Sequence, residues 1–180
     1  MRLFISIDFP DDVLAEVQSW LPEQKAWKKA KNHQMHLTLA FLGECTDAEK
    51  EAIHQKLSAI EFKPFLVTIS GLSAFPNESA PRIIWAGVQP TDLLMSLQKE
   101  ISVQLQDFIK SKKEHSYIPH ITLARKKSPK GINHIVKQNL KQETADIEVK
   151  VDAFHLKESI LKPSGSEHQV LHQYKAEPGT

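Results

Sequence analysis

The chain of 180 residues is 41% hydrophobic and 25% charged, which is ordinary for a globular protein and predicts one domain over residues 1–180. Its 23 basic and 22 acidic side chains leave a net charge of +1, so the overall charge makes no case for nucleic-acid binding. No apolar run is long enough to span a membrane, Asp8 interrupts the N-terminal segment too early for a signal peptide, and the single Cys45 excludes an internal disulfide, which together predict a cytoplasmic protein.

The first part of the chain predicts a strand, a helix, a loop and a second strand. Residues 2–7 alternate between two faces as a strand does, and residues 10–21 carry apolar side chains at helical spacing. Residues 22–34 are basic and predict a loop. Residues 35–42 predict the second strand.

A capping box marks the start of the next helix, because Thr46 is placed to cap the backbone and Glu49 to reach back to it. Strands are predicted at about 64–72 and 82–88, separated by a plain loop over 75–81. This part therefore adds one helix and two strands.

The longest predicted helix begins after Thr91, an N-cap residue. Its expected buried side comprises Leu93, Leu94, Leu97, Ile101, Leu105, Phe108 and Ile109. Pro119 then precedes a strand over 120–124, a position that proline tolerates. Beyond this strand we expect a turn at 128–131 and a short helix at 132–141.

Two final strands are predicted at about 145–157 and 168–174, on either side of a turn at 163–166. Many strands combined with a few helices are typical of an α+β protein.

One five-residue phrase occurs twice in the chain. Residues 36–40 read His-Leu-Thr-Leu-Ala, and residues 120–124 read His-Ile-Thr-Leu-Ala. Because alternate side chains of a strand share a face, each copy presents a histidine and a threonine on one face and apolar side chains on the other. The repeat predicts two similar lobes, each contributing one motif strand to a central cleft with a histidine on either side. That arrangement suits acid–base chemistry.

Two basic clusters interrupt the balanced charge. They consist of Lys25, Lys28, Lys29 and Lys31 before the first motif and of Arg125, Lys126, Lys127 and Lys130 after the second. A charge run is usually a solvated face, but the second cluster adjoins the predicted cleft. Side chains of this kind make most phosphate contacts.

The repeated motifs, with His36 and Thr38 in one and His120 and Thr122 in the other, resemble the H-x-T-x signature of the 2H phosphoesterases. The wider context resembles the bacterial and archaeal RNA 2′,3′-cyclic phosphodiesterases, once called 2′-5′ RNA ligases. The segments that carry this context are residues 2–5, 41–43, 81–88 and 119–125. The resemblance extends from residue 2 to about residue 174. Where such proteins usually have an aromatic residue after Gly165, this chain has His168.

The resemblance implies a bilobal α+β fold with two pseudo-symmetric lobes of antiparallel sheet, outer helices and a central cleft. It also implies hydrolysis of the 2′,3′-cyclic phosphate of RNA or of a cyclic nucleotide to a 2′-phosphate, with no metal and no cofactor. Reverse 2′-5′ ligation is implied as a weak side activity. We expect a monomer that does not associate with membranes.

Opening a cyclic phosphodiester requires one group that accepts a proton and another that donates one. Imidazole has an ordinary pKa near ~6.5, so His36 and His120 can fill both roles near neutral pH. We expect His36 to be the general acid for the leaving 3′ oxygen and His120 to be the general base for water. The sequence is nearly symmetric, so the opposite polarity stays open.

Other residues are expected to assist at this site. Thr38 and Thr122 would donate hydrogen bonds to the phosphoryl oxygens, and Arg125 would neutralise the phosphate, although strand alternation puts Arg125 off the active face. Phe4 either stacks on a base or lies in the core, and we expect Trp85 in the core.

No metal site is predicted, since neither His33 with His36 nor His168 with His172 has further ligands at suitable spacing. Two alternatives stay open. The same fold could act on 2′-5′ oligoadenylates, ADP-ribose 1″,2″-cyclic phosphate or U-tailed RNA, or the chain could be a non-catalytic RNA-binding module using its basic loops. The paired motifs argue against the latter, because binding alone needs no facing titratable groups.

Overall fold

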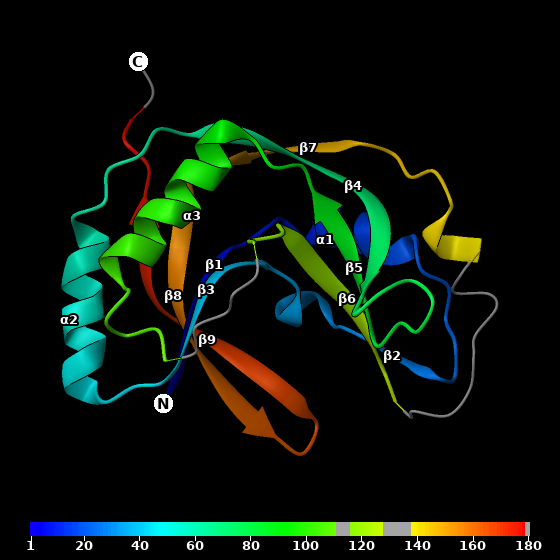
Figure 1. The fold of residues 1–180 in the computed structure, drawn as a ribbon, viewed down its shortest axis with the longest axis horizontal. Coiled ribbons are helices and arrows are strands. Elements are labelled where there is room, and N and C mark those ends of the chain that lie inside the picture. Colours follow the sequence, from blue (N-terminus) through cyan, green and yellow to red (C-terminus); the bar gives the residue numbers. More distant parts are fainter. Residues whose placement is uncertain (111–115, 128–137, 179–180) are drawn as a thin grey trace.

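A computed structural model describes residues 1–110, 116–127 and 138–178. The described residues form a single curled sheet of nine strands with helices packed against it (Figure 1). The strands are β1 (Arg2–Ile7), β2 (Trp27–Lys29), β3 (Leu37–Glu44), β4 (Phe65–Phe75), β5 (Ile83–Val88), β6 (His120–Lys126), β7 (Ile147–Val151), β8 (Ala153–Lys162) and β9 (Gly165–Lys175). The helices are α1 (Asp11–Ser19), the 3-10 helix η1 (Asn32–Gln34), α2 (Asp47–Ser58) and α3 (Asp92–Gln104).

The order of strands in the sheet divides it into two halves. It runs β7-β4-β5-β6-β3-β1-β8-β9, with β2 beside β6, and every pair is antiparallel. In each half the motif strand pairs with an earlier strand, and the connection between the two contains a helix: α1, followed by β2 and η1, between β1 and β3, and α3 between β5 and β6. The motif strands β3 and β6 meet at the centre. The predicted α+β fold with two similar lobes is therefore confirmed.

The buried core lies on the face of the sheet that α3 covers. Residues of β1, β3 and β6 that alternate toward this face are fully buried, among them Ile5, Leu37 and Ile121. α3 contacts both β3 and β4, and α2 lies beside α3 (Figure 1). The opposite face of the sheet, which we call the groove face, carries the motif histidines and threonines.

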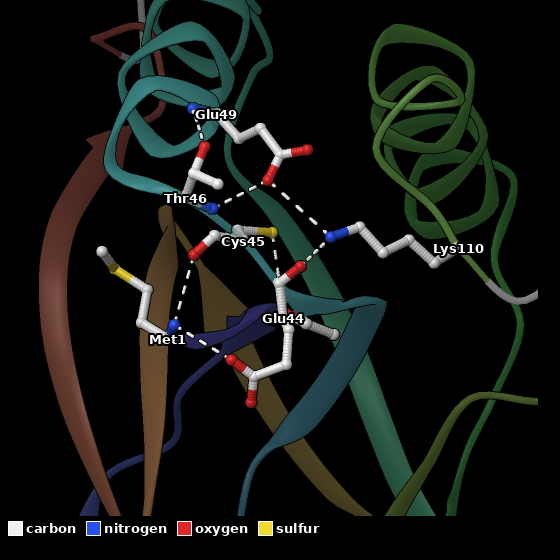
Figure 2. Close-up of polar contacts among 7 residues, drawn as sticks. Met1, Glu44, Cys45, Thr46, Glu49 and Lys110 are labelled. Atoms are coloured by element: carbon white, nitrogen blue, oxygen red, sulfur yellow. Dashed lines mark hydrogen bonds and ion pairs between the residues drawn. The ribbon is translucent and has the colours of Figure 1, made fainter.

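Both predicted helix caps are present. The Thr46 hydroxyl accepts a hydrogen bond from the Glu49 backbone N–H, and the Glu49 carboxylate accepts one from the Thr46 N–H at 2.7 Å (Figure 2). The Thr91 hydroxyl caps α3 in the same way through the Leu94 N–H. One expected buried residue is wrong: Leu93 is 59% exposed, because the buried stripe of α3 is formed by Leu94, Leu97 and Ile101.

The start of β1 is tied to the end of β3 by charged groups. The Met1 ammonium donates to the Glu44 carboxylate at 3.1 Å and to the Cys45 carbonyl at 3.2 Å (Figure 2). The Lys110 ammonium contacts the Glu44 carbonyl and lies 3.7 Å from the Glu49 carboxylate. These contacts join β1, β3, α2 and the segment after α3. The Cys45 thiol is buried among them, as a structural cysteine would be.

Two regions differ from the sequence-based predictions. The loop predicted over 22–34 contains β2 and η1. Since β3 pairs with β6 only near its start, the rest of that edge of β6 is open, and β2 fills it. The strand predicted over 145–157 is two strands, because Val151 pairs with β4 whereas Ala153 pairs with β9.

Other boundaries shift by a few residues. β4 continues to Phe75 and β9 begins at Gly165. The predicted turn at 128–131 and most of the helix at 132–141 lie outside the described residues.

We expect the Leu37→Ala substitution to lower the free energy of unfolding by about 2–5 kcal/mol, because it leaves a cavity where the two halves of the sheet join. Urea unfolding followed by circular dichroism measures this loss. Leu66→Ala makes the same chemical change at a residue that is 57% exposed, and should cost less than about 1 kcal/mol. Equal losses in the two variants would contradict the central role of Leu37.

Candidate active site

A groove of about 860 Å³ opens on the groove face, and both halves of the sheet line it. All five residues that the sequence nominated reach it: His36, Thr38, His120, Thr122 and Arg125. The described residues that line the groove include the basic residues Arg2, Lys28, Lys29, Lys110 and Arg125 but no aspartate or glutamate. The chain is nearly neutral overall, yet its groove is suited to an anion.

The pairing of the motif strands places each histidine next to the threonine of the other motif. Leu37 lies directly opposite Ile121 in antiparallel register. Extending this register by one residue on each side sets His36 across from Thr122 and Thr38 across from His120. The two histidines are then diagonal neighbours, a relation that in antiparallel sheets separates residues by about 7–8 Å. This spacing leaves room for a phosphate between the imidazoles.

Both motif strands contain a β-bulge at the same point of the repeated phrase. Leu39 is skipped in the register between β3 and β1, and Leu123 is skipped between β6 and β5. An extra residue reverses the alternation of faces beyond it. The bulge therefore brings Arg125 onto the groove face, which corrects the expectation that it would lie off that face.

The same shift in β3 brings Phe41 to the equivalent position in the other half. Phe41 pairs with Phe4 just as Arg125 pairs with Ile83, and its ring is 56% exposed in the groove. One half thus presents an aromatic ring where the other presents a guanidinium. A nucleotide, which has a base and a phosphate, matches this pair.

Aromatic rings hold the two histidines in place. The Phe4 ring lies 4.9 Å from that of His36, and the Phe75 ring lies 5.0 Å from that of His120 at 86°. Phe4 is only 2% exposed, so its ring packs against His36 and is not accessible for stacking on a base. Trp85 is half-buried on the groove face, 5.5 Å from His120, and not in the core as expected.

His168 is a site residue that the sequence analysis missed. It lies on β9 and lines the groove, with its ring 5.0 Å from both His36 and Phe4. From the sequence, His168 is notable only as a residue in place of the usual aromatic and as a possible metal ligand with His172, and neither observation predicts a contact with His36. Its position follows from the pairing of β9 with β8, which the sequence did not predict in this register.

Two hydrogen bonds restrain the start of β6, one at His120 itself and one between the preceding segment and β3. Nδ1 of His120 lies 2.7 Å from the Ile118 carbonyl oxygen, and because a carbonyl only accepts, Nδ1 carries the proton. A proton transfer by His120 would then take place at Nε2. The Tyr117 hydroxyl donates to the Thr38 carbonyl at 2.6 Å and so links the start of β6 to β3.

The electrostatic setting of His36 is unusual. Its pKa is lowered from 6.5 to about 3, mainly by burial and then by Lys157 and His168, while Asp8 acts in the opposite direction. His36 is therefore uncharged near neutral pH. Which of the two imidazoles donates a proton and which accepts one therefore stays a prediction, since a donor must carry its proton when it acts.

Parts of the two basic clusters noted in the sequence meet where β2 pairs with β6, and Lys130 lies outside the described residues. β2 pairs with β6 so that Lys28 is opposite Arg125, and both line the groove. Lys29 also lines it and donates to the Leu21 carbonyl at 2.7 Å. Lys28, Lys29 and Arg125 thus place three positive charges on this side of the groove.

Within residues 1–110, 116–127 and 138–178, no group of three or more His, Cys, Asp or Glu side chains is placed to hold a metal ion. In the same ranges no helix is long and apolar enough to cross a membrane.

Comparison with known proteins agrees with this geometry. The family model of the 2′-5′ RNA ligase superfamily matches residues 9–159. An RNA 2′,3′-cyclic phosphodiesterase of Archaeoglobus fulgidus is 30% identical over 180 residues, covering 97% of this chain and 100% of that protein. One of Thermotoga maritima is 32% identical, covering 99% of this chain and 97% of that protein. The crystal structure of TT0787 of Thermus thermophilus is similar with a TM-score of 0.81, at 28% identity and 97% coverage of both chains.

The low pKa of His36 predicts that acid destabilises the protein. Between the folded value of about 3 and the ordinary value near 6.5, the unfolded chain binds a proton that the folded protein does not. The free energy of unfolding should then fall as the pH drops from 7 to 4, by up to about 1.4 kcal/mol per pH unit for this one group. His155 and His168, whose pKa values are also lowered by burial, add to the fall.

Urea unfolding of the wild type and of His36→Gln at pH 7, 5 and 4 measures this contribution. The variant should lose less stability on acidification than the wild type does. Parallel pH dependences would contradict the lowered pKa of the half-buried His36.

Proposed function

The chain belongs to the 2′-5′ RNA ligase superfamily, and we propose that it is an RNA 2′,3′-cyclic phosphodiesterase that opens terminal cyclic phosphates to 2′-phosphomonoesters. The observation that carries this proposal is the groove itself. Two imidazoles on adjacent antiparallel strands face each other diagonally across a basic cleft, each next to the hydroxyl of the other motif. Transfer of a phosphoryl group between water and a ribose oxygen needs this combination of donor, acceptor and anion site.

The hydrogen bond from Nδ1 of His120 to the Ile118 carbonyl supports His120 as the proton acceptor, because Nε2 is then the nitrogen that can take a proton. His120 accepts a proton from water while the water oxygen bonds to phosphorus. The bond between phosphorus and the ribose O3′ breaks, and His36 donates a proton to that oxygen. The products are a 2′-phosphomonoester and a free 3′-hydroxyl, and proton exchange with solvent restores both imidazoles.

Three further residues suit the stabilisation of charge on the phosphoryl oxygens. The hydroxyls of Thr38 and Thr122 lie beside the histidines, and the Arg125 guanidinium reaches the groove through the bulge in β6. Phe41, at the equivalent bulge, offers an exposed ring for the terminal base. Transition-state charge on the oxygens is thus met by groups already in place.

We infer that the enzyme acts as a cytoplasmic monomer without metal or cofactor. One chain supplies both motifs to one groove, so the site needs no second copy. The two imidazoles supply both proton transfers that the reaction requires. Reverse 2′-5′ ligation would use the same groups in the opposite direction as a weak side activity.

The first test uses a short RNA ending in a 2′,3′-cyclic phosphate, with a chelator present. We expect ring opening by the wild type and a fall of roughly 10²–10⁴-fold in kcat for both His36→Ala and His120→Ala, because each removes one proton transfer. Chromatography identifies the phosphomonoester, which should carry its phosphate on O2′.

His172→Ala is the matched control, since His172 lies opposite the core residue Leu156 and does not line the groove. A product with its phosphate on O3′ would show that O2′, and not O3′, is the leaving oxygen. No turnover of cyclic phosphate by folded wild type, with cleavage of 2′-5′ oligoadenylates or ADP-ribose 1″,2″-cyclic phosphate instead, would refute the proposed substrate. RNA binding without any turnover would refute catalysis altogether.

The role of Arg125 has a separate test. Arg125→Gln should lower kcat/KM roughly 10- to 100-fold, the cost of one charge-assisted hydrogen bond to phosphate. It should also reduce the slope of log affinity against log salt by about 0.7, the value for one phosphate contact on single strands. Lys126→Gln changes the adjacent residue, which does not line the groove, and should leave both quantities near wild type. Equal effects of the two substitutions would contradict a phosphate contact by Arg125.

A further inference from the structure

We propose that Tyr117 and Gln98 are positioning residues for the first motif. Their side chains donate hydrogen bonds to two consecutive backbone carbonyls of β3, those of Thr38 and Leu39, and so hold the bulge that directs the Thr38 hydroxyl into the groove. Both donors come from the connection between β5 and β6, in the other half of the sheet. The inference rests on the proposed ring opening, and it assigns roles to two residues that do not line the groove.

The backbone of β3 needs these donors because its pairing with β6 is short. The only paired position in the described part of the two strands is Leu37 opposite Ile121. If this register continued, Leu39 would lie opposite Pro119, which has no N–H to donate. The Pro119 carbonyl accepts instead from the Val88 N–H of β5 at 3.1 Å, so the chain before β6 pairs toward β5. Beyond Leu37, the described part of β6 thus gives β3 no further ladder partner.

Two side chains take the place of the ladder at this point. The Tyr117 hydroxyl donates to the Thr38 carbonyl at 2.6 Å, and Nε2 of Gln98 donates to the Leu39 carbonyl at 3.2 Å. Both donors are restrained themselves, since Gln98 also donates to the Ser102 hydroxyl at 2.9 Å and the Tyr117 ring packs against the core. Carbonyls removed from water require hydrogen-bond partners. The two hydrogen bonds therefore select one orientation of these consecutive peptides.

The bulge of β6 is anchored in a corresponding way. Its Leu123 carbonyl accepts a hydrogen bond at 2.7 Å from the Ala30 N–H, and Ala30 lies in the connection between β1 and β3. Leu39 and Leu123 occupy the same place in the repeated phrase, so each bulged leucine is held by the connection of the opposite half. Two independent anchors at equivalent positions indicate that the groove requires a fixed bulge. In β3 the donors are side chains, and each can be removed without changing the backbone.

The bulge controls the direction of Thr38. This residue directly precedes the skipped Leu39 and lines the groove beside His120. Rotation of the peptide between Thr38 and Leu39 would turn the threonine hydroxyl away from the phosphoryl oxygens. Donors that stabilise a transition state act best when they are already in place before charge develops. Loss of the anchor should therefore lower kcat more than it raises KM.

The Tyr117→Phe substitution tests this, because it removes one hydroxyl and keeps the ring. On the short RNA ending in a 2′,3′-cyclic phosphate we expect kcat to fall roughly 10- to 100-fold, as for a small misplacement of a catalytic group, with KM little changed. The NMR signal of the Thr38 carbonyl carbon should also move, since its hydrogen bond is lost.

The other tyrosine of the chain provides the matched control. The Tyr174 hydroxyl lies 2.9 Å from Nδ1 of His54, and Tyr174 is buried on β9 and does not line the groove. Tyr174→Phe therefore also removes a hydrogen-bonded hydroxyl, and it should keep the kcat of the wild type. Equal falls of kcat in the two variants would show a general loss of structure and overturn the proposal.

A double-mutant cycle tests whether the effect passes through Thr38. Thr38→Val removes the threonine hydroxyl and keeps the branched shape of the side chain. If Tyr117 acts by positioning that hydroxyl, adding Tyr117→Phe to Thr38→Val should change kcat by no more than about twofold. Gln98→Met removes the second donor and should show the same dependence on Thr38. It carries the test if Tyr117→Phe does not fold.

An unchanged kcat in folded Tyr117→Phe and Gln98→Met would overturn the proposal. Effects that multiply with that of Thr38→Val would overturn the action through Thr38. Absence of ring opening by folded wild type would refute the proposed function instead, and the Thr38 carbonyl signal would still decide whether the Tyr117 hydroxyl holds this peptide.

Discussion

The antiparallel pairing of Leu37 with Ile121 is the constraint on which the site depends. These two buried residues are where the halves of the sheet meet, and their register decides which motif residues face each other. A slip by one residue would turn the histidines toward the core and the leucine and isoleucine toward the groove. Burial of the apolar face therefore fixes the catalytic face as well, since the same strands carry both. The two imidazoles are therefore positioned by the same packing of the apolar face that stabilises the fold.

The repeated phrase encodes more than a histidine and a threonine. Its fourth residue, Leu39 or Leu123, forms a bulge, so the residue just after the five-residue phrase turns back to the groove. Arg125 and Phe41 occupy these positions. The repeat thus supplies identical geometry on both sides, and the residue just after it supplies the difference. This is how a pseudo-symmetric sheet can receive a substrate with two unlike ends.

The sequence predicted the fold class and the positions that line the groove, because both follow from strong local patterns. Each of these patterns indicates a single local structure. They are the alternation in β1 and β3, the capping box at Thr46 and the duplicated motif. The sequence-based prediction was wrong where strand boundaries depend on long-range pairing. Residue 152 separates β7 from β8 because the residue before it pairs with β4 and the residue after it pairs with β9. His168 and Lys157 were missed for the same reason. Their places depend on how β8 and β9 align with β1, and no local pattern in the sequence specifies that alignment.

Acid–base catalysis by two like groups requires that their surroundings differ. If two imidazoles had the same pKa, then at a pH equal to that value only about a quarter of molecules would have a chosen one neutral and the other protonated. Separating the two pKa values raises this fraction toward one. Since the motifs of this chain are nearly identical, the separation must come from residues outside them. At His36 the pKa is lowered by burial first and by Lys157 and His168 next, while Asp8 acts in the opposite direction. The motifs therefore predict the catalytic pair, whereas its polarity depends on side chains that the motifs do not include.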